Sequence, residues 1–242
     1  MSGAGNGRLT MGIDVGSRTT KAVIWDGNKV VGRELIGTGW TPDKSAEEAY
    51  RAVLNISGVQ VDKVVVTGYG RGSARGFEYD TVTEITAHAR GVGRLLPSTR
   101  TLIDIGGQDS KAIVLEPGGL VTDFAMNDRC AAGSGKFLEF LALTMDMEIA
   151  DFAELAYSSD SPAQISSICT VFAESEVLSM LAEGFRRRDV AAGVHRSIAN
   201  RVGRMAKALH PAPPAAFSGG VARNRCMVKE LSRTLGFDIT VP

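Results

Sequence analysis

The sequence has few cysteines, no excess of either charge and no long apolar run. Three cysteines in 242 residues are too few for a disulfide scaffold, so we expect reduced thiols or metal ligands. The 27 basic residues balance the 27 acidic ones, which leaves no net field to attract nucleic acid or an anionic membrane. No apolar run approaches the ~20 residues of a membrane span, and residues 1–10 are too polar for a signal peptide. We therefore expect a cytoplasmic protein with no nucleic-acid or membrane partner.

The most informative feature that is present is an internal repeat. Residues 13–31, IDVGSRTTKAVIWDGNKVV, align with residues 103–121, IDIGGQDSKAIVLEPGGLV, at a constant offset of 90 (103 − 13). Each copy is typical of a strand, a Gly-containing turn directly after an Asp, a second strand, another turn and a third strand. The chain is long enough for two small domains, and the duplication predicts two similar α/β halves.

The rest of the chain alternates between strand and helix patterns. Ser45 and Glu48 have the spacing of a capping box, which predicts that a helix starts at Ser45. A strand is expected at 63–67, and the 3.6-residue period predicts helices over 83–96, 133–145, 150–157, 171–185 and 189–209. The segment 215–241 should form a final strand, turn, helix and strand.

The repeated turns are candidates for binding a phosphorylated ligand. Parallel strands place ligands beyond their carboxyl ends, so two facing copies should form a cleft. The turns offer backbone N–H groups and hydroxyls to phosphates, while Asp14 and Asp104 can hold a hydrated Mg²⁺ or orient water. These turn residues are Gly16, Ser17, Thr19, Thr20, Gly106, Gly107, Gln108, Asp109 and Ser110. A third Gly-rich turn, 217–222, follows an apolar strand and can approach a nucleotide closely. Phosphoryl transfer or hydrolysis is the chemistry indicated.

These segments resemble those of the actin, Hsp70 and sugar-kinase superfamily. IDVGSRTTK resembles phosphate motif one, IDIGGQDSK phosphate motif two, and FSGGVARN the adenosine motif. The resemblance implies duplicated actin-like, ribonuclease H-like ATPase subdomains over 1–97 and 98–242, with a nucleotide cleft between them. It implies catalytic roles for Asp14, Asp104 and Gln108, and adds to the nucleotide-binding residues Lys21, Lys111, Ser218, Gly219, Gly220 and Asn224. Such a fold does not fix the function.

Two of the cysteines distinguish among those functions. Cys130 and Cys169 each precede a predicted helix, and helix N-termini stabilise a thiolate or an anionic cluster. Their small and polar neighbours argue against a buried, inert pair. Two cysteines cannot complete a 4Fe-4S site, so a cluster would need two copies of the chain, which a symmetric homodimer supplies. Cys226 matches no ligand position and is expected to be a helix-packing thiol.

The cysteine segments NDRCAAGSGKFLE and SSICTVFAESEV are similar to those of the activator ATPases of 2-hydroxyacyl-CoA dehydratases and benzoyl-CoA reductases, the BadF/BadG/BcrA/BcrD type. The resemblance implies that Cys130 and Cys169 of two subunits hold one 4Fe-4S cluster per dimer. It also implies that ATP hydrolysis drives single low-potential electrons from a ferredoxin or flavodoxin to a dehydratase or reductase component under anaerobic conditions. Relatives continue past the last strand into a helix, whereas this chain ends at Val241-Pro242, so a truncated C-terminus is expected.

Two other functions stay open. A sugar or amino-sugar kinase of the same superfamily would carry no cluster, and a filament or regulator would turn over ATP slowly without iron. The segment 133–136, GSGK, lacks the leading Gly and the Ser/Thr of a Walker A loop. Glu84 and His88 stand one helical turn apart and are expected to be a helix-surface pair rather than metal ligands. His195 and His210 carry no recognisable motif.

Overall fold

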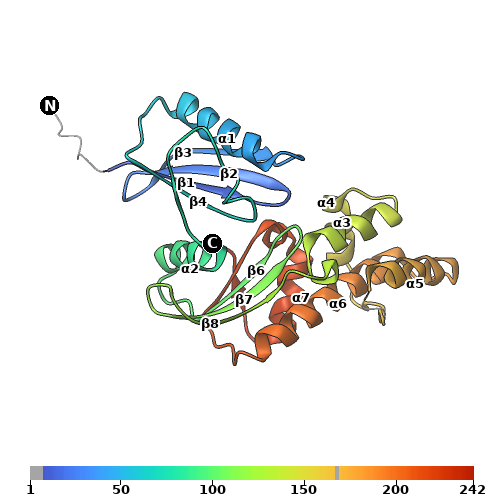
Figure 1. The fold of residues 1–242 in the computed structure, drawn as a ribbon. Coiled ribbons are helices and arrows are strands. Elements are labelled where there is room, and N and C mark those ends of the chain that lie inside the picture. The colour runs from blue at the N-terminus through green and yellow to red at the C-terminus, as the bar shows by residue number, and fades with distance from the viewer. Residues whose placement is uncertain (1–7, 167–168) are drawn as a thin grey trace. The chain divides into compact units, whose positions relative to one another are not determined.

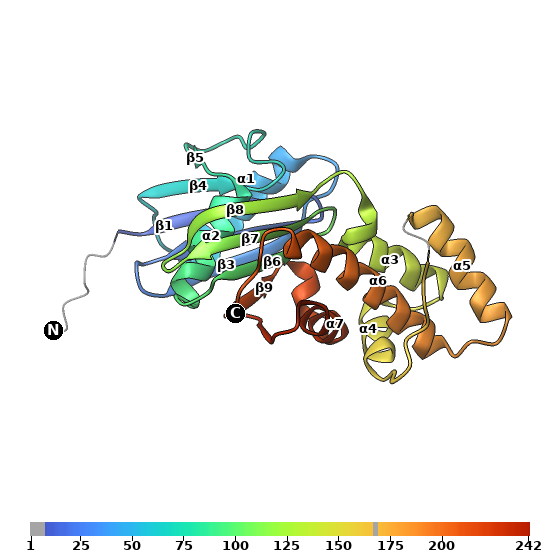
Figure 2. The same cartoon turned by 90° about the horizontal axis from the view of Figure 1, so that it is seen from below.

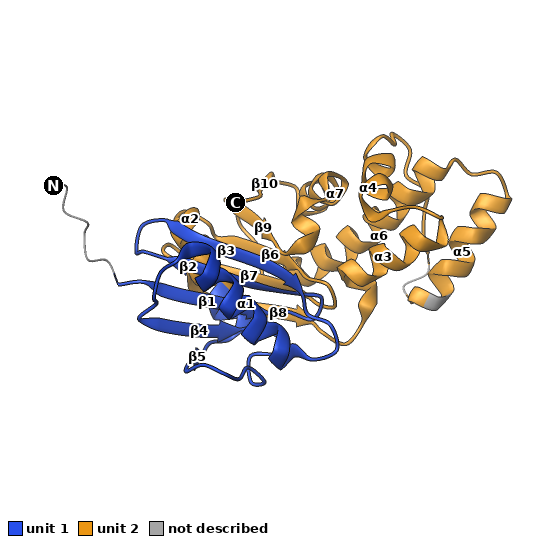
Figure 3. Cartoon of the chain, turned by 90° about the horizontal axis from the view of Figure 1, so that it is seen from above, with its two compact units in different colours: residues 1–87 blue, residues 88–242 orange. Residues whose placement is uncertain are grey.

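The computed structural model describes residues 8–166 and 169–242, which divide into two compact units over residues 1–87 and 88–242 (Figure 3). The division falls within helix α2 (Glu84–Leu95). The boundary expected from the sequence, after residue 97, lies just past the end of that helix. No helix in the described part of the chain is long and apolar enough to cross a membrane.

Unit 1 is a five-stranded sheet in the order β3-β2-β1-β4-β5, covered by helix α1 (Figure 1). Its strands are β1 (Thr10–Val15), β2 (Thr19–Trp25), β3 (Val30–Gly37), β4 (Lys63–Thr67) and β5 (Asp80–Thr81). Alternate residues of β1 and β2 are buried, as expected for strands with one face against a core. The strand predicted at 63–67 is confirmed.

Helix α1 (Pro42–Ser57) begins three residues before the predicted start, so the capping-box prediction was wrong. Pro42 occupies the first turn, where its fixed φ favours a helix start and its missing N–H costs nothing. Ser45 is consequently inside the helix and buried. Its hydroxyl donates to the carbonyl oxygens of Thr38 and Thr41, which ties the helix to the end of β3.

Unit 2 repeats the same sheet in the order β10-β9-β6-β7-β8. Its strands are β6 (Thr101–Ile105), β7 (Ser110–Glu116), β8 (Leu120–Asn127), β9 (Ala215–Ser218) and β10 (Ile239–Thr240). The two inner hairpins share one register, because Asp14 pairs with Lys21 and Asp104 pairs with Lys111. Even the irregularity recurs, between Ile24 and Trp25 in one copy and between Val114 and Leu115 in the other. The duplication predicted from the sequence is therefore a duplication of the fold.

Unit 2 differs from unit 1 by a group of helices inserted between β8 and β9. They gather at one end of the second sheet (Figure 2) and comprise η1 (Ala131–Gly133), α3 (Gly135–Thr144), α4 (Ile149–Tyr157), α5 (Thr170–Ala182) and α6 (Arg187–Lys207). After β9 come η2 (Gly220–Arg223) and α7 (Arg225–Leu235). The five predicted helices and the final strand, turn, helix and strand are confirmed within a few residues. Helix α6 lies at the centre of this core, where its buried face packs on α4 and α7.

Candidate functional site

The first phosphate turn, residues 14–21 in unit 1, is organised around Asp14 and Lys21. Because these residues face each other on β1 and β2, the Lys21 ammonium reaches Asp14 Oδ2 at 3.0 Å. It also donates to the carbonyl of Thr19 at 3.3 Å. Their side chains stay 40% and 35% exposed, which leaves both able to contact a ligand. Thr20 is different, because its side chain is buried with its hydroxyl 3.1 Å from that of Thr38.

The second phosphate turn, residues 104–111 in unit 2, repeats this arrangement in a more buried form. Lys111 lies 3.3 Å from Asp104 Oδ2 and 2.8 Å from Asp109 Oδ2, and its side chain is only 2% exposed. The turn closes through the Gly106 N–H, which donates to the Asp109 carbonyl. Gln108, by contrast, is exposed. The carboxylates of this turn are therefore fixed, while Gln108 remains available to solvent or ligand.

Asp104 is held on both carboxylate oxygens. Lys111 contacts Oδ2, while the Ser218 hydroxyl donates to Oδ1 at 2.9 Å and His88 Nδ1 lies 3.6 Å from Oδ1. Burial acts to raise the pKa of the Asp104 carboxyl, but His88, Lys111 and the Ser218 hydrogen bond outweigh it and keep the pKa below its ordinary value. Asp104 is thus a carboxylate at neutral pH, suited to holding a metal or orienting water.

His88 is a site residue that sequence reasoning missed. It was expected on a helix surface with Glu84, but it is partly buried and its Nδ1 lies 3.2 Å from the Ser218 hydroxyl. The contact spans 130 positions of the sequence, so helical spacing alone carried no signal for it.

The third turn, residues 217–224, lies directly beside the second. Strands β6 and β9 are parallel and pair Asp104 with Ser218. Gly219 has a φ of +90°, and a Cβ there would lie 2.3 Å from the Ile105 carbonyl oxygen. Only glycine fits this close approach of two backbones. Asn224, expected to bind adenosine, uses its side chain to cap α7, with Oδ1 accepting from the Met227 N–H at 3.0 Å.

Helix α3 is docked on the second phosphate turn. The backbone N–H of Gly135 donates to the Gly106 carbonyl at 2.9 Å, and that of Lys136 donates to the Gly107 carbonyl at 2.8 Å. These are N–H groups of a helix start, which have no partner within their own helix. The turn therefore supplies what the helix N-terminus lacks, and the two cannot move independently without breaking both bonds.

The cysteines differ in their surroundings as predicted. Cys130, partly exposed, directly precedes η1 and the α3 start, and its carbonyl accepts from Asn127 Nδ2 at 2.9 Å. Cys169 is exposed and stands at the N-cap of α5. Cys226 is buried within α7, where burial, followed by the charge of Glu230, raises the pKa of its thiol to about 12. The expectation that Cys226 is a packing thiol is confirmed.

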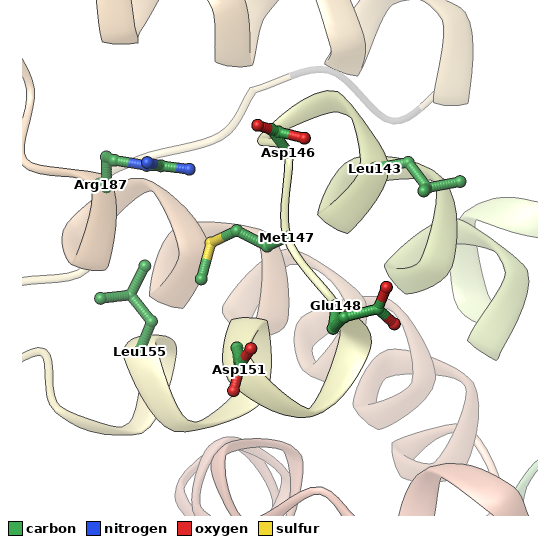
Figure 4. A pocket seen from close by; sticks show the side chains of 7 residues that line it. All are labelled: Leu143, Asp146, Met147, Glu148, Asp151, Leu155 and Arg187. Atoms are coloured by element: carbon green, nitrogen blue, oxygen red, sulfur yellow. The ribbon is translucent and has the colours of Figure 1, made fainter.

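No group of three or more metal-ligating side chains occurs among the residues that the structure describes. One chain thus offers Cys130 and Cys169 as two accessible thiols, fewer than an iron-sulfur cluster needs. A cavity of about 570 Å³ between α3, α4 and the start of α6 lies elsewhere (Figure 4), and none of its lining residues belongs to the three turns.

Comparison with known proteins places this geometry in a family. The model of the BadF/BadG/BcrA/BcrD ATPase family matches residues 11–242. This chain belongs to that family. Among the curated members of the BadF/BadG/BcrA/BcrD ATPase family, the 2-hydroxyisocaproyl-CoA dehydratase activator of Clostridioides difficile is 41% identical over 96% of this chain and 88% of the relative. A subunit of the benzoyl-CoA reductase of Thauera aromatica is 32% identical over 94% of this chain and 83% of the relative.

Solved structures agree with this assignment. The C. difficile activator with bound ADPNP superposes with a TM-score of 0.89 at 40% identity, covering 97% of this chain and 88% of that one. Component A of the (R)-2-hydroxyglutaryl-CoA dehydratase of Acidaminococcus fermentans has a TM-score of 0.90 at 38% identity, covering 97% of this chain and 92% of that one. A ROK family glucokinase from Streptomyces griseus, 15% identical with a TM-score of 0.57, shares the fold alone. The predicted actin-like α/β fold is confirmed.

Proposed function

We propose that this chain is an ATP-hydrolysing activator that passes single low-potential electrons to a 2-hydroxyacyl-CoA dehydratase or benzoyl-CoA reductase component. Relatives named for the activation of such dehydratases, and one that belongs to a benzoyl-CoA reductase, support the choice of partner. A solved relative with bound ADPNP supports the choice of nucleotide. The electron donor would be a ferredoxin or a flavodoxin.

In this proposal ATP is bound with Mg²⁺ by the turns after Asp14 and Asp104. The backbone N–H of Gly107 and the hydroxyls of Ser17 and Thr19 would face the phosphates, as such groups do in anion sites. The N–H groups of Gly16 and Gly106 close their own turns by donating to the carbonyls of Thr19 and Asp109. Gly219 and Gly220 allow the adenosine to approach the backbone closely. The buried hydroxyl of Thr20 and the capping amide of Asn224 are used within the protein, so their part is structural support.

The carboxylates have separable roles in hydrolysis. Asp104 has a lowered pKa and is held by Lys111 and Ser218, so it is a weak base and a good Mg²⁺ or water ligand. Asp14 is more exposed, and its contact with Lys21 is a single ion pair that a metal can replace. Gln108 is exposed at the second turn and can orient the attacking water.

The observation that carries the proposal is the docking of α3 on the second phosphate turn. A shift of Gly106 or Gly107 on loss of the γ-phosphate would be passed through two hydrogen bonds to Gly135 and Lys136. Cys130 stands five residues before Gly135 along the chain. The nucleotide state can thereby change the position of a ligand thiol, which a sugar kinase would have no use for.

Cys130 and Cys169 of two chains would supply the four thiolates of one 4Fe-4S cluster. Such a cluster, when bound, accepts and releases one electron at a time. Both cysteines are at least partly exposed, so a second chain could reach their thiols without a rearrangement of the fold. The homodimer is part of the same proposal.

The proposal is tested by measuring iron, dimerisation and ATP turnover on one anaerobic preparation. We expect a brown dimer that hydrolyses ATP and, with reduced ferredoxin, reduces a dehydratase component only while ATP is present. A colourless protein that phosphorylates a sugar would replace it with the kinase function. Slow ATP turnover without iron would indicate the filament or regulator.

A further inference from the structure

One face of helix α6 carries polar and basic side chains where an apolar stripe would be expected. Ser197, Asn200, Arg201 and Arg204 follow the spacing i, i+3, i+4, i+7, which places them on a single side of the helix. This side lines a cavity of about 340 Å³ rather than packing on the core. The opposite wall is formed by Ala132, Phe137 and the segment 164–166.

The two arginines bring uncompensated positive charge to this cavity. Among the described residues, neither Arg201 nor Arg204 has a hydrogen-bond or ion-pair partner. By contrast, the N-cap Arg186 and the α6 residues Arg187, Arg188 and Arg196 contact Asp189, Glu230 or a backbone carbonyl. Arg201 is partly buried, which makes an unpaired guanidinium there costlier than one in open solvent.

The acceptor groups of Asn200 and Glu176 beside the cavity already have hydrogen-bond partners, so the groups that remain free are mainly donors. Asn200 Oδ1 already accepts from Arg233 and Thr234, so its amide N–H₂ remains to donate. The carboxylate near the cavity, Glu176, accepts two bonds from Ser166, at 2.8 and 2.7 Å. A cavity with two free guanidiniums and a free amide, whose nearby carboxylate is already engaged, is complementary to an anion.

We propose that this cavity binds a phosphate group, either free or carried by a small molecule, through Arg201 and Arg204. The planar guanidinium matches the oxygens of phosphate bidentately, and two such forks one helical turn apart can hold one phosphate. The cavity lies in the size range of small-molecule sites, so there is room for more than an ion. The site is independent of the ATP turns and of the function proposed above.

The position of the cavity gives such a ligand a consequence. Ala132 lies two residues after Cys130, and Ser166 lies three residues before Cys169. A phosphate held by Arg201 and Arg204 would therefore lie in a cavity that is lined by residues from both of the segments that carry Cys130 and Cys169.

Calorimetric titration of the full chain tests the proposal, using inorganic phosphate and glycerol 3-phosphate as probes with saturating Mg-ADPNP present to occupy the nucleotide turns. Wild type and Lys207→Ala should bind a probe with the same affinity, because Lys207 is an exposed cation on α6 outside the cavity. Arg201→Ala/Arg204→Ala should weaken binding by about ten-fold or more, since two charge-assisted contacts are lost. Tighter binding of inorganic phosphate identifies the free ion, and tighter binding of glycerol 3-phosphate a phosphorylated molecule.

A second variant guards against a folding defect. Arg201→Lys/Arg204→Lys keeps the charge but removes the planar forks, and should bind more weakly than wild type while retaining the helical circular dichroism. Unchanged affinity in the double alanine variant, or an equal loss in Lys207→Ala, would overturn the proposal. A change in self-association of the double variant with phosphate binding intact would also overturn it, and would assign this face to a second copy of the chain.

Discussion

The imidazole of His195 accepts a 2.8 Å hydrogen bond at Nε2 from the side-chain amide of Asn224. This contact fixes the histidine tautomer, because Nδ1 must then carry the proton that it donates to the Ala191 carbonyl. It also fixes the amide of Asn224, whose oxygen caps α7 through Met227. A residue without any sequence motif therefore holds the third turn against the central helix.

Stability should depend on the protonation of His195. Burial lowers the pKa of the imidazole to about 4, against 6.5 for an ordinary histidine, with only partial compensation from Ala191 and Glu230. The unfolded chain then takes up a proton below pH 6.5 that the folded chain refuses until about pH 4, so stability falls as pH falls through this window. From pH 7 to pH 5 the loss should be about 2 kcal/mol.

Urea midpoints at pH 7 and pH 5 measure this loss. His195→Gln keeps a donor and an acceptor but has no titrating group, so its midpoints should move less between the two pH values than those of wild type. Equal movement in both proteins would show that other groups cause the pH dependence.

Asp104→Asn should lower ATP hydrolysis by about 100-fold or more while the iron content is kept, because the carboxylate is the proposed Mg²⁺ or water ligand. Asp14→Asn should act in the same way. Asp238→Asn, which changes an exposed carboxylate near the last strand, is the matched control and should retain wild-type turnover. Full activity in both site variants would remove these residues from the mechanism, and loss of iron in a folded variant would contradict two separate sites.

Substitutions of the three cysteines should have different effects on the iron content. Cys130→Ala and Cys169→Ala should each abolish the cluster, whereas Cys226→Ala should keep about two iron atoms per chain, one cluster divided between two subunits. Iron determination and size-exclusion chromatography on anaerobic protein report the iron content per chain and the oligomeric state. A monomer with a complete cluster, or wild-type iron in either ligand variant, would refute the shared-cluster proposal.

Gly219→Ala should destabilise unit 2 by on the order of 2–4 kcal/mol, because its φ of +90° and the Ile105 carbonyl 2.3 Å from a Cβ leave no room for a side chain. Gly220→Ala is the matched control, since a Cβ on the adjacent residue meets nothing within 4 Å. Thermal unfolding of the two variants should differ clearly. Similar midpoints would mean that the β6–β9 edge can relax.

The sequence predicted the parts of this fold that are periodic or repeated. The duplicated segments located both hairpins because a strand register follows from local alternation and turn length. The helix start at Pro42 was missed because Ser45 and Glu48 had the right spacing without the right backbone. Spacing describes which residues could interact, and the proline decided where the helix begins.

Only the repeated residues of the candidate site could be predicted from the sequence. Asp104 and Lys111 could be found because they repeat Asp14 and Lys21. His88 and the docking of α3 on Gly106 and Gly107 are contacts between distant segments, and no local pattern encodes them. The same is true of Thr20 and Asn224, whose polar groups are hydrogen-bonded within the protein.

The contrast between Cys226 and the other two thiols has a practical consequence. A thiol that is 1% exposed and has a pKa of about 12 will not react with an alkylating reagent at neutral pH until α7 opens. Labelling of Cys226, read by mass spectrometry, therefore times the opening of the unit 2 core. In the iron-free protein the more accessible Cys130 and Cys169 would be alkylated first. The later alkylation of Cys226 would then report unfolding of unit 2 without an engineered probe.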